Sequence, residues 1–244
     1  MLRDHAATCA APADRVASAS SPLLVLEASG TTGSIALLGA ADGERVRPLL
    51  GETTLTMGAS RTDGLTPSVT ALLATHRVPV DSLGGVVCGA GPGSFTSLRI
   101  AAALAKGLAF ASGLPLYAVP SLALATPARL DGTLEPGAWL VTADALRGER
   151  FAQPVDVHAD GALHVPTPAR RGVPDGWPTA WADRREVALA TGGAASPRAA
   201  HVRWLAHLSA WGPVSLDDWE PSYGRLAEAQ VQWEARHGTP LPAR

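Results

Sequence analysis

The sequence predicts an α/β fold made of two subdomains, each a mixed sheet with helices. Short apolar runs, typical of buried strands, alternate with segments whose apolar residues follow helical spacing. The composition changes after Pro127, where the stretch "ARLDGTLEPG" separates a regular first half from a less regular second half. With 244 residues, 46% of them apolar, the chain is long enough to bury a core in each half. We therefore expect a disordered N-terminal extension over 1–21, subdomains over 22–127 and 128–225, and a C-terminal helix or tail over 226–244.

The first subdomain is predicted to begin with a hairpin. Leu23–Ala28 and Gly33–Leu38 are apolar runs joined by a turn of glycines and small hydroxyl residues, which favours an antiparallel pair. The apolar residues at positions 65, 69, 72 and 73 follow the spacing i, i+4, i+7, i+8 and predict a helix that ends near Pro79. A longer helix follows the segment "GPGSF". The remaining predicted elements are strands over Pro48–Leu55, Gly84–Ala90 and Leu116–Val119, and a short helix from Pro120–Ser121 to Thr126.

The second subdomain is harder to predict. Strands are expected over Trp139–Asp144 and Arg150–Val155, as a hairpin. The segment 160–178 is rich in proline and glycine and supports no assignment. Apolar residues three positions apart, at 202, 205 and 208, predict a helix over Arg198–Ala210, and Leu226–His237 is predicted to be a final helix.

Composition limits the class of function. The net charge is −2 and the pI is about 6.4, so the chain lacks the basic character of a nucleic-acid binder, and we expect a partner to make any RNA contact. The two cysteines form no disulfide framework, and Cys88 sits in an apolar run, which fits a reducing compartment. Residues 1–21 do not resemble a signal peptide. No stretch approaches the roughly 18 apolar residues of a membrane span. We expect a soluble, cytoplasmic protein.

The segment "GAGPGSFTSLRIAAALAKGLA" contains the most specific pattern in the chain. Gly91 and Gly93 allow tight or left-handed turns, Pro92 restricts one φ, and Ser94 or Thr96 can cap the following helix. Free N–H groups at a helix start attract anions, so a phosphate site is one interpretation. However, a P-loop needs a lysine after the glycines, a dinucleotide fingerprint needs a third glycine where Ser94 stands, and the G-x-S-x-G elbow is missing. The other interpretation is a glycine turn that leads into a buried helix.

The helix after this loop is apolar on nearly every face. Such a helix must be buried, either within its own domain or against another chain. Its alanines permit close helix–helix approach, and a sheet with only two helices near it would not cover all of their sides. Core burial and an oligomeric interface therefore both stay open. The residues concerned are Leu98, Ile100, Ala101, Ala102, Ala103, Leu104, Ala105, Leu108, Ala109 and Phe110.

Several segments together resemble one known family. "GAGPGSFTSLRIAAALAKGLAF" closely resembles the GPGSFTGLRIG…AKGLA segment of the TsaB (YeaZ) family of bacterial tRNA threonylcarbamoyladenosine (t6A) synthesis. "LLVLEASGTTGSIALL" is similar to the N-terminal hairpin of that family. "ASRTDGLTPSVTALL", "VPSLALAT", "LVTADALRGERFAQPVDV" and "EPSYGRLAEA" resemble its weaker segments, in the same order. The resemblance spans roughly Leu23 to Arg225 and is strongest in the first half.

The resemblance implies an actin-like, Hsp70-like (ASKHA) nucleotidase fold and a non-catalytic role. In this family TsaB is a paralogue and partner of the catalytic subunit TsaD. With the ATPase TsaE, the pair transfers a threonylcarbamoyl group to N6 of adenosine 37 in tRNAs that read ANN codons. The helices beginning at Leu65 and Thr96 would pair with TsaD, or form a homodimer when TsaD is absent, and tRNA would be contacted only through the complex. The interface residues implied are Leu65, Val69, Leu72, Thr96, Arg99, Ala102, Ala105 and Ala109, and the structural loop is Gly91, Pro92, Gly93, Ser94 and Phe95.

Few residues could give the chain chemistry of its own. The family's catalytic paralogue binds a metal through H-x-x-x-H on its first long helix, whereas here that region has only His76, at its far end. We therefore expect no metal site, no catalytic residue and no cofactor of its own, with ATP or ADP and Mg in the partner complex. Thr31 and Thr32 are the candidate nucleotide contacts. The alternative is an actin-like ATPase or small-molecule kinase that uses Thr31, Thr32 and Glu27 around Mg-ATP.

Some positions depart from the family pattern. Glu27 stands where the family usually has aspartate, and its extra methylene would displace a bound magnesium or water. Gly58 occupies the place of the family's histidine before Ser-Arg. Ser97 and Ala101 stand where the family prefers glycines, and we expect them to alter the partner surface. Two further residues have open roles: Arg99 is a partner salt bridge or a solvated side chain, and Asp144 faces the cleft or caps a hairpin.

Overall fold

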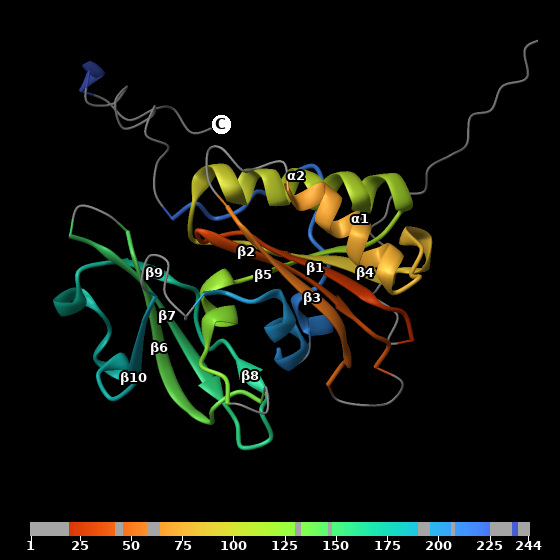
Figure 1. The fold of residues 1–244 in the computed structure, drawn as a ribbon. Helices are drawn as coiled ribbons and strands as arrows, with labels where there is room; N and C mark the ends of the chain where they lie inside the picture. The colour runs from red at the N-terminus through yellow and green to blue at the C-terminus, as the bar shows by residue number, and fades with distance from the viewer. Residues whose placement is uncertain are drawn as a thin grey trace, which may run out of the picture.

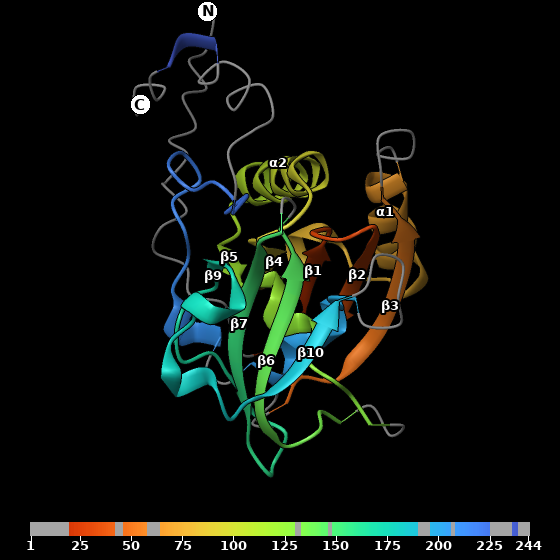
Figure 2. The same cartoon turned by 90° about the vertical axis from the view of Figure 1, so that its left-hand side faces the viewer.

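The computed structural model of this protein describes residues 20–41, 46–57, 64–129, 133–145, 148–189, 196–205, 208–224 and 236–238. These residues form two five-stranded sheets, with two helices on the outer face of the first sheet (Figure 1). Seen from the side, the second sheet lies in front of the first (Figure 2). Within the described ranges, no helix is long and apolar enough to cross a membrane.

The first sheet is mixed and has the strand order β3-β2-β1-β4-β5. The first three strands form an antiparallel meander, and β4 and β5 then run parallel to β1. The helices α1 (Leu65–Thr75) and α2 (Phe95–Ser112) are the two crossover connections. The strands are β1 (Leu23–Glu27), β2 (Thr32–Leu38), β3 (Leu49–Thr56), β4 (Gly85–Gly89) and β5 (Leu116–Val119).

The second sheet is also mixed and has the order β10-β6-β7-β8, with β9 paired to β7. Its centre is the β6–β7 hairpin, and β10 runs parallel to β6. The strands are β6 (Gly137–Asp144), β7 (Arg150–Val157), β8 (Leu163–His164), β9 (Arg170–Gly172) and β10 (Arg185–Leu189). Short 3₁₀ helices connect them and the flanking segments: η3 (Val80–Ser82), η4 (Ser121–Ala125), η5 (Pro174–Gly176), η6 (Thr179–Trp181), η7 (Ala199–Trp204) and η8 (Leu208–Trp211).

The two faces of the first sheet bury separate cores. Side chains alternate across a strand, so Leu24 and Leu26 of β1 pack with α1 and α2 on one face. On the opposite face, Leu23 and Val25 pack with η4, η7 and residues of the second sheet. Because both faces are covered, β1 and β4 are buried along their whole length and appear in the sequence as continuous apolar runs.

The segment containing η7 joins the second half of the chain to the first sheet. The N–H of Ala199 donates to Ser34 Oγ (2.7 Å) and the N–H of Ala200 donates to Glu52 Oε1 (3.1 Å). Arg198 pairs with the same carboxylate. Next to them, Nδ1 of the buried His201 lies 2.7 Å from the carbonyl oxygen of Leu124. Burial lowers the pKa of His201 from 6.5 to about 4, and the positive charge of Arg198 acts in the same direction.

Most predicted elements of the first half are present, and one prediction in the second half is wrong. Arg198–Ala210 is not an α-helix: the chain there forms η7 and the start of η8, two separate 3₁₀ turns. The short helix predicted after Pro120 is also a 3₁₀ helix, η4. The expected N-terminal extension lies outside the described residues up to residue 19, as does the helix predicted over 226–237 except at its last two residues, which are helical.

Candidate functional site

The loop between β4 and α2 is packed closely against two other segments. A Cβ atom at Gly93 would lie 2.3 Å from the carbonyl oxygen of Ser29. A Cβ atom at Gly91, whose φ is +86°, would lie 2.2 Å from the carbonyl oxygen of Ser222. Neither position therefore accepts a larger residue without moving the backbone. The N–H of Ser94 donates to Ser29 O at 2.7 Å, which holds the loop against the β1–β2 turn.

The β1–β2 turn is the segment proposed above to contact a nucleotide. Thr31 is exposed and Thr32 is half-buried, and the carbonyl oxygen of Thr31 accepts a hydrogen bond from the N–H of Met57 (2.8 Å). On the facing loop, the N–H of Gly91 already donates to Ser121 Oγ (2.9 Å). Contact of the two threonines with a nucleotide stays a prediction. What supports it is that both threonine side chains are at least partly accessible.

Glu27 is buried at the end of β1, directly before this turn. Its Oε1 accepts a hydrogen bond from the N–H of Ser29 at 2.6 Å, and no described residue donates to Oε2 with good geometry. A Cβ atom at Gly89 would lie within 1.9 Å of Oε2, so glycine on β4 makes room for the longer side chain. Burial raises the pKa of Glu27, while the nearby Ser29 and Ser121 groups oppose the shift. Burial thus disfavours the charge that a magnesium ligand needs, and the carboxyl group fastens the turn.

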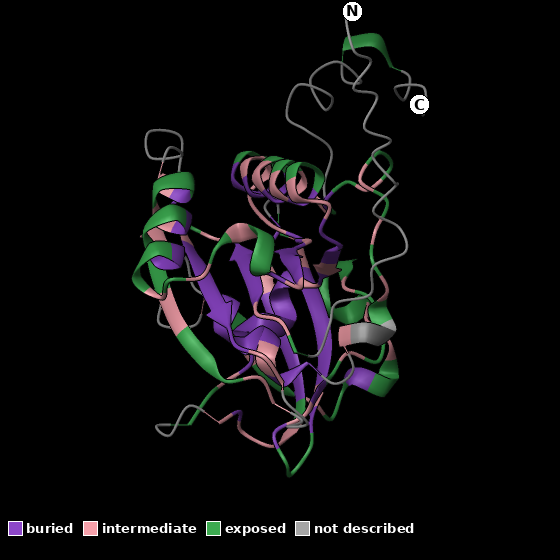
Figure 3. Ribbon diagram, turned by 90° about the vertical axis from the view of Figure 1, so that its right-hand side faces the viewer, coloured by how far each residue is buried: buried purple, intermediate pink, exposed green. Residues whose placement is uncertain are grey.

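Helix α2 packs one face onto the first sheet. Ala101, Ala105 and Ala109 are fully buried in the core that α2 shares with β1 and β4. Ala102 is 5% exposed. Alanines at these positions let the helix lie close to the strands, because no longer side chain separates the two backbones. Figure 3 shows this division, with buried residues on the side of α2 that faces the sheet.

The opposite face of α2 is open to solvent and largely apolar. Phe110 is 70% exposed, the largest exposure among the described large hydrophobic side chains. The half-buried Ile100, Leu104 and Leu108 flank this face. We call the exposed residues the α2 stripe; they recur every three or four positions, as one side of a helix requires. The α2 stripe consists of Thr96, Arg99, Ala103, Gly107, Phe110 and Ala111.

Helix α1 is amphipathic, with one buried apolar side and an outer side of polar and small residues. Leu65, Val69 and Leu72 are 1%, 4% and 7% exposed and pack in the same core as α2. Its outer face consists of threonines and small residues, such as Thr70 and Ala74. The periodic apolar residues of α1 are therefore its sheet-facing side.

The structure corrects most of the interface residues inferred from the sequence. Thr96 and Arg99 are exposed, whereas the other six side chains are buried by the chain's own sheet and are not available to a partner. The physical reason is that both helices need one apolar face for their own subdomain, and these side chains form it. The residues concerned are Leu65, Val69, Leu72, Ala102, Ala105 and Ala109.

A segment that sequence analysis did not connect with the site lies beside it. Residues 214–224 run along α2 and the ends of β4 and β5; we call them the terminal segment. Val214 N–H donates to the carbonyl of Leu116 at 2.8 Å, and Ser222 N–H donates to that of Ala90 at 2.7 Å. The ammonium of Lys106 on α2 lies 5.8 Å from the ring centre of Trp219. Only the weak "EPSY" resemblance marked this segment in the sequence.

The terminal segment also contacts the first turn of α2. The ring centres of Phe95 and Tyr223 are 4.5 Å apart, and the guanidinium of Arg99 lies 5.3 Å from the Phe95 ring centre. Phe95 is therefore held between the terminal segment and the α2 stripe. An aromatic pair with a cation over one ring is a stabilising arrangement.

Comparisons with known proteins find relatives of tRNA threonylcarbamoyladenosine biosynthesis. Residues 59–158 match the model of the family "TsaD: tRNA N6-adenosine threonylcarbamoyltransferase". TsaB of Haemophilus influenzae, a tRNA threonylcarbamoyladenosine biosynthesis protein, is 31% identical over 100 residues, which is 41% of this chain and 39% of that protein. Its Escherichia coli counterpart is 30% identical over 111 residues, 42% of this chain and 44% of that protein. The alignments thus span less than half the length of these relatives.

A solved structure agrees over nearly its whole length. YeaZ from Pseudomonas aeruginosa superposes with a TM-score of 0.63 at 25% identity, covering 82% of this chain and 98% of that one. The family model, the two TsaB relatives and the YeaZ structure together support the TsaB/YeaZ family for this chain. Its fold is an α/β fold with two mixed sheets, as predicted, and it matches the fold of YeaZ.

Two departures from the TsaB/YeaZ pattern lie in the core of the chain. Ser97 is 1% exposed and its Oγ accepts a hydrogen bond from Ser94 Oγ at 3.1 Å, and Ala101 is fully buried against the sheet. The expectation that these two residues alter a partner surface is therefore wrong, because neither reaches the surface of α2. Gly58, Ser60 and Arg61 lie outside the described residues.

The remaining candidate residues that the structure describes are not gathered into a metal centre. Within the described ranges, no group of three or more His, Cys, Asp and Glu side chains is placed to hold a metal ion. Asp144 is exposed at the end of β6 and lies opposite Arg150 in the β6–β7 hairpin. Arg150 in turn pairs with Glu186 of β10 at 2.6 Å.

Proposed function

We propose that this chain is a non-catalytic partner subunit in tRNA threonylcarbamoyladenosine biosynthesis. It would bind a TsaD-like catalytic subunit through the outer faces of α1 and α2, and would form a homodimer when that subunit is absent. Threonylcarbamoyl transfer to N6 of adenosine 37 would then take place on the partner, with a TsaE-like ATPase supplying ATP turnover. The cytoplasm is the expected location, because that is where tRNA is modified.

The observation that supports this proposal best is the α2 stripe. An exposed Phe110 beside Ala103 and Gly107 gives a helix face on which another helix can pack closely. The stripe is apolar between Arg99 and its C-terminal end, where a surface helix normally has charged residues. Contiguous exposed apolar surface of this kind marks sites of protein association.

The charge and the buried Glu27 support a role without direct catalysis or tRNA binding. A net charge of −2 provides no general attraction for a polyanion, so tRNA contact would come through the complex. Glu27 bonds its own turn and is inaccessible to a substrate. We propose no cofactor of its own, with ATP or ADP and Mg in the assembled complex and Thr31 and Thr32 as the nearest residues to a bound nucleotide.

The test is association with the TsaD-like subunit of the same organism. The full chain and the variants Phe110→Asp and Ala103→Glu are each mixed with that subunit, and the mass of the complex is measured by light scattering and its affinity by calorimetry. Both variants are expected to bind at least ~100-fold more weakly, because each places a charge in the centre of an apolar interface. They should also reduce formation of t6A in a reconstituted reaction.

The matched control is Val173→Asp. Val173 is 52% exposed in the connection between β9 and η5, on the other subdomain, so the same kind of substitution is made away from α2. Its affinity should equal that of the unaltered chain. Equal affinity for all four proteins would show that the α2 stripe is not the interface, and metal-dependent ATP turnover by the isolated chain, abolished in Glu27→Gln, would favour the kinase or ATPase alternative.

A further inference from the structure

Glu27 lies where the β1–β2 turn meets the loop that leads into α2. Its Oε1 accepts a hydrogen bond from the N–H of Ser29 (2.6 Å), and the carbonyl oxygen of Ser29 accepts one from the N–H of Ser94 (2.7 Å). Ser94 is the residue directly before α2. Because Glu27 is fully buried, its bond to the turn is shielded from water. One carboxyl oxygen is thus connected, through the turn, to the start of α2.

The second carboxyl oxygen of Glu27 lies next to a group that is bonded to the other end of the same loop. A Cβ atom at Gly89 would lie 1.9 Å from Oε2 and 2.8 Å from Ser121 Oγ, so these two oxygens are neighbours beside β4. Ser121 Oγ accepts a hydrogen bond from the N–H of Gly91 (2.9 Å), and the N–H of Ser121 donates to the carbonyl oxygen of Gly91 (3.0 Å). Glu27 therefore stands between the β1–β2 turn and both ends of the loop.

The surroundings of Glu27 do not favour an ionised carboxylate. Oε2 is buried, and no described residue donates to it with good geometry. The groups beside it on β2, β4 and η4 are uncharged: Ser34, the thiol of Cys88, and Ser121. Burial raises the pKa of Glu27 and that of Cys88, and a charge on Glu27 would raise the pKa of the thiol further. A buried charge without a counter-charge is strongly unfavourable, so the neutral acid is the favoured form.

Helix η7 packs on the same face of β1, and its charged groups are engaged elsewhere. Arg198 pairs with Glu52, and Arg203 lies over an indole ring. His201 is neutral at the pH where Glu27 would ionise, because burial lowers its pKa to about 4. None of these groups contributes to the pKa shift of Glu27, so none of them supplies a counter-charge.

We propose that Glu27 is a neutral acid that donates a proton from Oε2 to Ser121 Oγ, and that loss of this proton separates the β1–β2 turn from the β4–α2 loop. A serine oxygen has two lone pairs, so it can accept from both the carboxyl O–H and the N–H of Gly91. Ionisation leaves a buried charge without a counter-ion, and the two segments separate until water reaches it. Because the loop leads directly into α2, loss of the proton also loosens the first turn of this helix. This inference does not depend on the proposed function, because it concerns bonds within the isolated chain.

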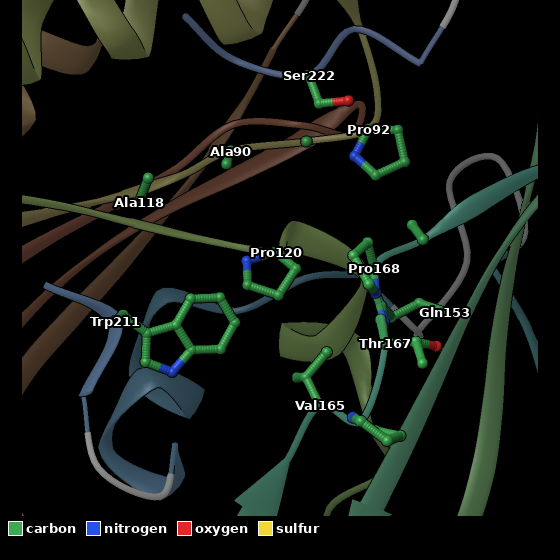
Figure 4. A pocket seen from close by; sticks show the side chains of 13 residues that line it. Ala90, Pro92, Ala118, Pro120, Gln153, Val165, Thr167, Pro168, Trp211 and Ser222 are labelled. Atoms are coloured by element: carbon green, nitrogen blue, oxygen red, sulfur yellow. The ribbon is translucent and has the colours of Figure 1, made fainter. Parts of the chain in front are cut away.

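The proposed contact lies beside a cavity of about 320 Å³ between the two sheets. Gly91 and Pro120, which is next to Ser121 in the sequence, line this cavity, and Figure 4 shows Pro120 and Pro92 among the side chains that border it. None of the thirteen lining residues, all of which the structure describes, carries a charge. The cavity therefore offers no counter-ion to an ionised Glu27, but it is a space from which water can reach the separated segments.

The first measurement detects the proton directly. The ¹³Cδ resonance of Glu27 is followed in the full chain as the pH is raised, and the same resonance in the urea-unfolded chain gives the reference. We expect Glu27 of the folded chain to titrate above its ordinary pKa of 4.5, because burial disfavours the charged form. A folded chain in which Glu27 titrates at or below the reference holds an ionised carboxylate near neutral pH, and this result would overturn the proposal.

The second measurement detects the opening. Hydrogen-exchange protection factors of the N–H groups of Gly91 and Ser94 are compared between the unaltered chain and Glu27→Gln at each pH, with the N–H of Val25 in the centre of β1 as the internal control. In the unaltered chain the two protection factors should fall by up to ~10-fold for each pH unit between the unfolded and folded pKa values of Glu27. Val25 should keep its protection.

Glu27→Gln is the matched variant because glutamine is neutral at every pH and its amide can donate to Ser121 as the acid does. Its protection factors at Gly91 and Ser94 should not change over this pH range. An equal fall in both proteins would contradict the role of the Glu27 proton. Constant protection in the unaltered chain would contradict the opening, and this outcome is decisive even if Glu27→Gln does not fold.

Discussion

The two faces of the first sheet differ in how completely the chain covers them. The face toward the second sheet is covered by η4, η7 and the second sheet, and two buried polar groups there are bonded to the chain: Ser34 to Ala199 and His201 to Leu124. Among the described residues, the other face packs against α1, α2, the segment around η3 and the terminal segment. The outer surface of α2 is left apolar and exposed, with Phe110 at its end. One face of the sheet is thus covered by the second sheet, whereas the helices on the other face leave apolar surface exposed.

This difference shows that the apolar residues of one helix can serve two purposes: packing within the subunit on one side, and association with another chain on the other. On α2, Ala105 packs within the subunit, whereas Ala103, two residues earlier, faces solvent. The first residue serves folding and the second is available for association. Substitutions at the two positions should therefore separate stability from assembly, and the predictions below test that separation.

The largest effect is expected from a charge on the side of α2 that packs on the first sheet. Ala105→Asp places an unpaired carboxylate between α2 and the first sheet, and should lower the free energy of unfolding by at least ~4 kcal/mol, or prevent folding. Urea denaturation measures this value. Ala103→Asp is the matched control on the same helix and should change it by less than about 0.5 kcal/mol. Similar losses for both variants would contradict the assignment of the two faces.

The stability of the packing toward the second sheet should depend on pH through His201. Its pKa is about 4 in the folded chain against 6.5 for an ordinary histidine, so the unfolded chain binds a proton first as the pH falls. Stability is therefore fully present above pH 6.5 and is lost as the pH falls toward about 4, by a total on the order of 3 kcal/mol.

Comparing the chain with His201→Asn at each pH isolates this effect. Asparagine can still donate to the carbonyl of Leu124 but does not titrate. The comparison is needed because burial raises the pKa of Glu27, which has the opposite sign: its contribution is present below the ordinary pKa of 4.5 and is lost as the pH rises through its higher folded value. If the stability difference between the two proteins is constant from pH 4 to 7, His201 is not buried as described.

The smallest effect on stability is expected on the open face. Phe110→Ser removes a side chain that is 70% exposed, and phenylalanine and serine have similar helix propensities. The free energy of unfolding should change by less than about 0.5 kcal/mol, while association with the TsaD-like subunit weakens. A stability loss comparable to that of a core substitution would mean that Phe110 packs within its own subunit.

The first half of the fold could be predicted because its strands are buried on both faces. Runs such as Leu23–Glu27 and Gly85–Gly89 are continuous and apolar, and glycine turns separate them from the next element. By contrast, β8, β9 and β10 have two, three and five residues and few buried side chains. They form strands because they pair with β6 and β7, and no local pattern in the sequence predicts this pairing.

The wrong helix over Arg198–Ala210 has a specific cause. Val202, Leu205 and Leu208 are three residues apart, and residues i and i+3 line up in a 3₁₀ helix rather than in an α-helix. An interval of three alone does not separate the two helix types, and here Val202 lies in η7, Leu205 follows it, and Leu208 begins η8.

The sequence predicted partner-interface residues on α1 and α2, but most of them lie on the sides that the two helices turn to their own sheet. Leu65, Val69 and Leu72 were predicted as a helical stripe, and a stripe of that spacing is the side that a helix turns to its own sheet. On α2, alanine occupies both sides, so composition does not distinguish them. The distinction depends on how the glycine loop at 91–93 leads the chain over β1 and β4, which is a property of the folded backbone.

The terminal segment has a consequence for the order of events during synthesis. Trp219 borders α2, and Ser222 is bonded to the end of β4, yet both residues are translated after every strand of the two sheets. A nascent chain can form its first subdomain while this flank is still missing. The surface beside Lys106 and Phe95 therefore forms after the rest of the first subdomain. A partner that contacts both α2 and the terminal segment can then bind only chains in which this segment has been translated.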